Sequence, residues 1–69
     1  MEMRMKLIYK HIQLVQAGKF AVARGILKLL TTGSLVLYFD DVSYEIEKVL
    51  EKLAVKCSIN RRGVATYRI

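Results

Sequence analysis

Residues 42–69 encode an amphipathic helix followed directly by a hairpin, and this pair constrains the fold more than any other feature. The helix is indicated by apolar residues at positions i, i+3, i+4, i+7 and i+8, which are Ile46, Val49, Leu50, Leu53 and Ala54. Asp40, Asp41 and Ser43 precede this stripe, and these residue types cap helix N-termini. We therefore expect a helix that starts near Asp41 and buries one face.

The hairpin is predicted from two segments, 55–59 and 64–69, in which residues of the two faces alternate. The segment Asn60–Gly63 joins them as a loop of four residues. Gly63 can supply the positive φ that such a loop requires.

Two arginines, Arg61 and Arg62, then lie side by side at the exposed tip of the hairpin. The alternation directs Lys56 and Arg68 to the outward face. It directs Cys57 to the buried face, where we expect a structural thiol.

A further strand is predicted over Leu35–Phe39, after a turn at Thr31–Ser34. This strand is apolar on both faces, so we expect it to be buried or to pair centrally. Together with the hairpin it makes a three-stranded antiparallel sheet, backed by three helices. The expected fold is α+β, in a single domain of residues 1–69.

The first segment, Met3–Val15, fits two patterns. Its first residues alternate as in a strand, whereas one helical face collects Met5, Ile8, Ile12 and Val15. Its methionines, glutamines and lysines favour helix by propensity, so we predict a helix that ends near Gly18.

Lys19–Leu30 is predicted as a second helix, apolar enough to require cover on two sides. We expect one of its stripes to form an interface with a partner, through Phe20, Ala23, Leu27 and Leu30. Gly25 in its middle either permits the close approach of another backbone or is simply tolerated.

The chain has 69 residues, of which 54 % are hydrophobic. A chain of this size buries only about 60 % of its unfolded surface. Cys57 is the single cysteine, so no disulfide within the chain and no Cys/His zinc site is expected. The apolar excess favours a homodimer or a subunit of a larger assembly.

Charge is distributed in three blocks that add to the net charge of +6. Residues 1–39 hold six basic residues and one acidic residue, and residues 40–53 hold five acidic and two basic ones. Residues 54–69 hold four basic residues and no acid. A polyanion would therefore be held by the two ends of the chain and not by the third helix.

No catalytic constellation is found. His11 is the only histidine, and no nucleophile is paired with it by a known motif. Asp40 and Asp41 are interpreted as helix caps and not as magnesium ligands. We expect no enzyme, no cofactor and no metal. No segment approaches the ~20 apolar residues of a membrane span, and we expect a cytoplasmic protein.

Nucleic-acid binding is the leading hypothesis, because arginine and lysine bind phosphate oxygens. The partner would be DNA or RNA, bound without strong sequence specificity. The residues expected to bind are Arg61, Arg62, Arg68 and Lys56, with help from Arg24, Lys28 and Lys10.

The segment Ser43–Ile69 resembles the end of a winged-helix domain, in which a hairpin wing follows a helix. The resemblance implies that Arg61 and Arg62 match the wing tip and that the preceding helix enters the major groove. Two departures are visible. Two helices are expected before the first strand and only one after it. The helix also exposes several glutamates, which phosphates repel. Binding through the wing and sheet edge, or a variant of the fold used for protein contact, is therefore favoured over sequence recognition.

The rival hypothesis is a protein-interaction module that dimerises or docks through the apolar second helix. The distribution of charge and apolar surface in the folded chain distinguishes the two.

Overall fold

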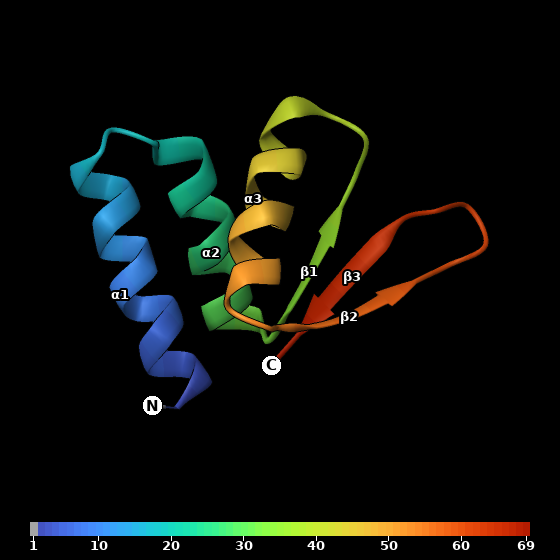
Figure 1. Cartoon of the computed structure of the whole chain (residues 1–69), viewed down its shortest axis with the longest axis horizontal. Helices are drawn as coiled ribbons and strands as arrows, with labels where there is room; N and C mark the ends of the chain where they lie inside the picture. Colours follow the sequence, from blue (N-terminus) through green and yellow to red (C-terminus); the bar gives the residue numbers. More distant parts are fainter. Residues whose placement is uncertain (1) are drawn as a thin grey trace.

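The computed structural model describes residues 2–69, and six elements lie in that range. In chain order they are α1 (Met3–Gln16), α2 (Phe20–Thr32), β1 (Ser34–Leu37), α3 (Asp41–Lys52), β2 (Lys56–Ile59) and β3 (Ala65–Arg68) (Figure 1). The α+β class is confirmed, with three helices and a small antiparallel sheet. The first segment is helical, as its residue propensities predicted.

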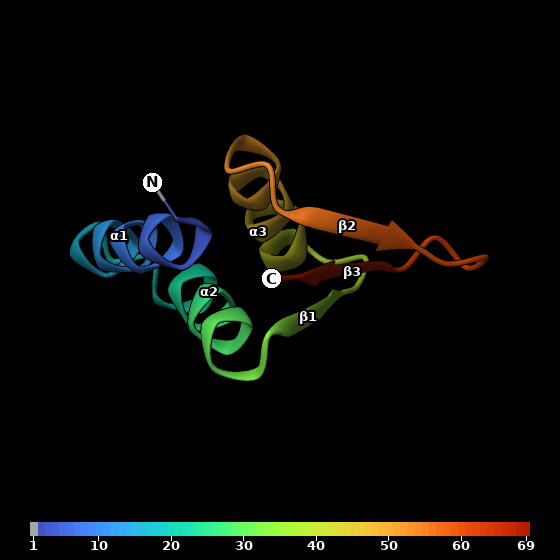
Figure 2. The same cartoon turned by 90° about the horizontal axis from the view of Figure 1, so that it is seen from below.

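The sheet has the strand order β1-β3-β2, so the last strand of the chain is the central one (Figure 2). Tyr67 in β3 pairs with Leu35 on one side and with Cys57 on the other, both antiparallel. The expectation that the first strand pairs centrally is wrong. β1 is an edge strand, and its Val36 is exposed because the helices cover only the face occupied by Leu35 and Leu37.

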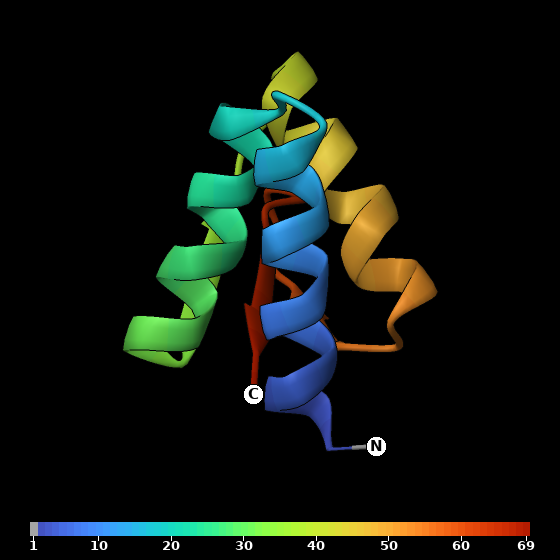
Figure 3. The same cartoon turned by 90° about the vertical axis from the view of Figure 1, so that its left-hand side faces the viewer.

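The molecule has three layers: α1, then α2 with α3, then the sheet (Figures 1 and 2). Viewed along the long axis, α1 lies in front of α2 and α3, and the sheet lies behind them (Figure 3). The core lies between these layers, and its most deeply buried side chains are Tyr67, Leu7, Ile26, Leu29 and Leu50. One face of the sheet therefore closes the core and the other is left without a covering layer.

The start of α3 is determined by side-chain hydrogen bonds. The carboxylate of Asp40 accepts a hydrogen bond of 2.7 Å from the backbone N–H of Ser43. The hydroxyl of Ser43 in turn accepts one of 3.2 Å from the backbone N–H of Tyr38. The first bond gives a partner to a backbone N–H of the first helical turn, which confirms the interpretation of Asp40 as a cap. The second bond joins the end of β1 to α3.

Gly25 allows α2 and α3 to approach closely. A β-carbon placed on Gly25 would lie 2.5 Å from Cδ1 and 3.3 Å from Cγ1 of Ile46 in α3. Gly25 therefore makes room for the side chain of Ile46 and not for another backbone, so the expectation that a backbone approaches it is wrong.

We expect Gly25→Val to lower the free energy of unfolding by about 1–3 kcal/mol, because the added methyls overpack the contact with Ile46. Urea denaturation measures the change. Ala21→Val is the matched control, since Ala21 lies on the same helix but is exposed. Equal losses in the two variants would show that the Gly25 contact has no energetic role.

Candidate nucleic-acid interface

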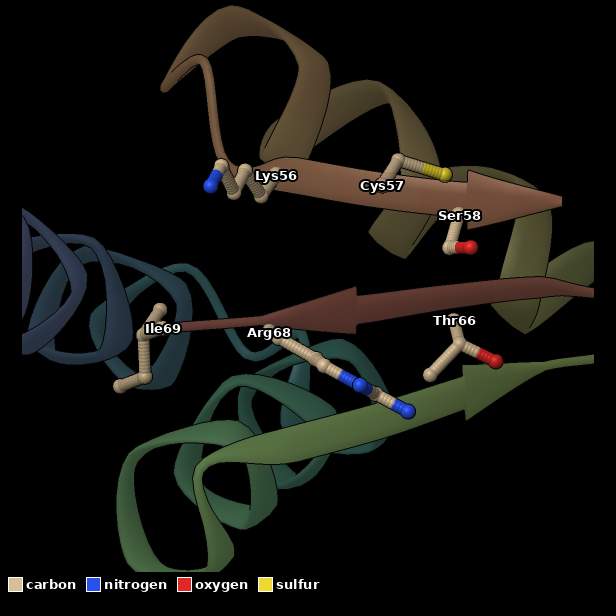
Figure 4. Close-up of a pocket in the computed structure, with 6 residues that line it drawn as sticks. All are labelled: Lys56, Cys57, Ser58, Thr66, Arg68 and Ile69. Atoms are coloured by element: carbon tan, nitrogen blue, oxygen red, sulfur yellow. The ribbon is translucent and has the colours of Figure 1, made fainter.

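The uncovered face of the sheet carries two cross-strand rows of side chains, which are polar or basic except for Val36. One row aligns Ser34, Arg68 and Lys56, and the next aligns Val36, Thr66 and Ser58. We call these six residues the open face. In Figure 4 the labelled side chains of Lys56, Ser58, Thr66 and Arg68 stand on the near side of the strands, with the helices behind. The open face borders a shallow cavity of about 530 Å³, lined by Lys56, Cys57, Ser58, Thr66, Arg68 and Ile69.

The two cations of this face are direct cross-strand neighbours. Lys56 pairs with Arg68 in the register of β2 and β3, and both side chains are exposed. Like charges in this position destabilise a sheet. In residues 2–69 the single ion pair joins Lys19 and Glu45 at 3.3 Å, so no carboxylate neutralises Lys56 or Arg68. A bound anion would be attracted to both charges, and the neighbouring hydroxyls of Ser58 and Thr66 are hydrogen-bond donors for it.

The hairpin tip is held by Asn60. Its side-chain oxygen accepts hydrogen bonds from the backbone N–H groups of Arg62, at 2.8 Å, and Val64, at 3.1 Å. The backbone N–H of Asn60 also donates to the carbonyl of Val64 at 3.1 Å, so the turn is tighter than the four-residue loop expected. Gly63 adopts a φ of 81°, as predicted. Arg61 and Arg62 are both exposed on this ordered turn.

The role of Asn60 was missed in the sequence, although a signal was present. Asparagine side chains commonly bond the backbone two residues further on and so stabilise turns. The residue before two arginines and a glycine could have been recognised on that basis.

The covered side of the hairpin is apolar and acidic. Burial is the main cause that raises the pKa of the Tyr67 phenol. The neighbouring Cys57 and the carboxylates of Glu47 and Glu51 raise this pKa further. Tyr67 itself is 2 % exposed. The two carboxylates belong to α3, so they act on the opposite side of the sheet from Lys56.

Cys57 does lie on the covered side, but the expectation that it is buried is wrong. The thiol is exposed, and Ile59 on the same side of β2 is 68 % exposed. The reason is that β2 is an edge strand that extends beyond the cover provided by the helices (Figure 2).

The other predicted binding residues are dispersed. Arg24 and Lys28 are exposed on α2, and neither lines the cavity beside the open face. Lys10 is half-buried on α1, which lies at the opposite end of the molecule from the hairpin tip (Figure 1). The structure brings together Lys56 and Arg68, with Arg61 and Arg62 at the end of the same hairpin.

The predicted interface stripe on α2 is divided by packing within the chain. Phe20 and Leu27 are exposed, at 63 % and 45 %. Ala23 is buried, and its carbonyl contacts Nδ1 of His11 at 2.9 Å. Leu30 is half-buried, and its carbonyl accepts a hydrogen bond of 3.0 Å from Arg4. Only two of the four residues therefore remain free for a partner, and His11 has a structural contact.

Within residues 2–69, no three or more histidine, cysteine, aspartate or glutamate side chains are grouped so that they could hold a metal ion. None of the helices in the same range combines the length and apolar character of a bilayer-crossing segment.

Comparisons of the chain with protein-family models, with curated proteins and with solved structures found no match. The resemblance to winged-helix domains thus depends on α3 and the hairpin alone. The order of elements keeps the departure expected from the sequence, with two helices before β1 and one between β1 and β2.

We expect the stability of the protein to fall as the pH rises above about 10, the ordinary pKa of tyrosine, because Tyr67 has a raised pKa in the folded state. The contribution of Tyr67 to the free energy of unfolding is fully present below that pH. It is lost as the pH rises further, because the phenol ionises more easily in the unfolded chain than in the folded one. Urea denaturation at about pH 8 and about pH 11 measures the loss. Between these two pH values, Tyr67→Phe should lose less of its free energy of unfolding than the wild type does. Tyr38→Phe, at an exposed position, should lose as much as the wild type. An unchanged loss in Tyr67→Phe would contradict the assignment.

Proposed function

We propose that this protein is a small, non-enzymatic nucleic-acid-binding domain that contacts phosphates through the open face of its sheet and its hairpin tip. The observation that carries the proposal is the unneutralised pair Lys56 and Arg68. The two residues are cross-strand neighbours beside the hydroxyls of Ser58 and Thr66. An uncovered sheet surface that carries two cations without a carboxylate partner is suited to an anionic partner.

Each group has a distinct task in this proposal. Arg68 can bind a phosphate through two parallel hydrogen bonds, while Lys56 acts as a flexible point charge. Arg61 and Arg62 extend the contact to a neighbouring phosphate or groove from the turn that Asn60 orders. Arg24, Lys28 and Lys10 add long-range attraction to the polyanion.

The acidic helix α3 restricts how the polymer approaches. Phosphates near Glu47 and Glu51 would be repelled, so binding on the covered side of the hairpin is unfavourable. Contact through the open face and tip keeps the polymer on the other side of the sheet. The proposal is thus wing-like binding to phosphates of DNA or RNA, without insertion of α3 into a major groove.

A protein-interaction module remains the second candidate. It is favoured by Phe20 and Leu27, which are exposed on α2 although they are large and apolar. It would dock a partner through that helix and would not require the open face.

The test is fluorescence anisotropy with labelled duplex DNA, single-stranded DNA and structured RNA at several salt concentrations. We expect the double variant Lys56→Ala/Arg68→Ala to bind about tenfold or more weakly, with the salt-dependence slope reduced by roughly 1 for each phosphate that is no longer bound. Arg61→Ala/Arg62→Ala should weaken binding in the same way.

The matched control is Lys48→Ala/Lys52→Ala, which also removes two exposed positive charges but from α3. It should leave the affinity within about twofold of the wild type, because its charges lie on the acidic helix. An equal loss in all three double variants would mean that only net charge matters. An absence of binding to all three polymers at low salt would overturn the proposed function.

A further inference from the structure

Helix α1 presents a second apolar stripe that residues 2–69 leave partly exposed. Its buried side places Leu7 and Leu14 in the core. On the other side the stripe consists of Met5, Ile8, Ile12 and Val15, each 40–46 % exposed. At 100° per residue these four side chains fall within about 80° of arc. The helix forms the outer layer of the molecule, so this stripe, which we call the α1 stripe, borders solvent (Figure 3).

The spacing of the α1 stripe is symmetric about residue 10. Steps of three, four and three residues separate its members, as in the a and d positions of a coiled coil. If a second α1 runs antiparallel about a twofold axis at residue 10, Met5 meets Val15 of the other copy and Ile8 meets Ile12. Such an interface is isologous, which is the requirement for a closed dimer.

Charge favours the antiparallel arrangement over the parallel one. Arg4 and Lys6 lie near the start of α1 and Lys10 lies at its centre, whereas residues 12–16 at its end carry no charge. An antiparallel pair places the basic start of each helix beside the uncharged end of the other and opposes the helix dipoles. A parallel pair would bring the two basic starts together, which is unfavourable.

The available area is sufficient for a modest dimer. Phe20 and Leu27 are exposed on α2, which packs along α1. If these six residues became fully buried, the area removed from solvent would be roughly 500 Å² for each protomer and roughly 1,000 Å² in total, which is the lower limit for a stable interface. We infer that the α1 stripe is the interface of an antiparallel homodimer. Since α1 and the hairpin lie at opposite ends of the molecule, this pairing leaves both open faces free (Figure 1).

The first test is sedimentation equilibrium of the wild-type protein over a range of concentrations. We expect a monomer–dimer equilibrium that shifts to monomer by at least about tenfold in dissociation constant for Ile12→Lys, because two charges would be buried at the twofold interface. The matched control is Ile59→Lys, which changes another exposed isoleucine, on the hairpin, and should leave the equilibrium unchanged. A wild type that stays monomeric at all concentrations, or an equal effect of both variants, would overturn the inference.

Cysteine cross-linking tests the geometry even if Ile12→Lys does not fold. In a Cys57→Ser background, Met5→Cys and Val15→Cys are oxidised separately and as a mixture. Antiparallel pairing holds identical positions about 15 Å apart along the helix axis, too far for a disulfide. We therefore expect cross-linked dimer in the mixture only. Cross-linking of Met5→Cys alone would indicate parallel helices and contradict the inference, as would no cross-linking in the mixture. Neither experiment involves nucleic acid, so failure here is separate from failure of the proposed function.

Discussion

The central position of β3 is the constraint on which the rest of the structure depends. This strand pairs on both sides, with β1 and with β2, and therefore joins the middle of the chain to its end. Its side chains alternate between two environments. Ala65 and Tyr67 close the core beneath the helices, whereas Thr66 and Arg68 point to the open face. One strand of four residues thus completes the hydrophobic core and supplies part of the candidate site.

The sheet also separates charge of opposite sign. The carboxylates of Glu47 and Glu51 act on Tyr67 from the covered side, while Lys56 and Arg68 stand on the open side. This separation explains why the modest net charge of the chain is a poor guide to its partner. Under the proposed function, a phosphate polymer would meet a basic surface from one direction and an acidic one from the other, and the fold would then determine the orientation of binding.

Much of the local structure could be predicted because it depends on neighbouring residues. The hairpin follows from alternation and from the positive φ that Gly63 adopts without strain. The same alternation placed Lys56 and Arg68 on one face. It was also right about the side on which Cys57 lies, yet wrong about its burial, because no residue near Cys57 indicates how far the helices extend. The prediction that one stripe of α2 forms a continuous interface was wrong for the same reason, because α1 covers Ala23 and leaves Phe20 exposed.

The sequence by itself determined where the helices and strands lie, where the chain turns, and which side chains share a face, since periodicity and glycine dihedrals act over a few residues. Only the tertiary structure decided that β3 lies between β1 and β2, that β2 extends past its cover, and that the α1 stripe meets solvent. These outcomes depend on pairing and packing between segments far apart in the chain. The energy of each such contact depends on the residues of both segments, so the residues of one segment alone do not specify the arrangement.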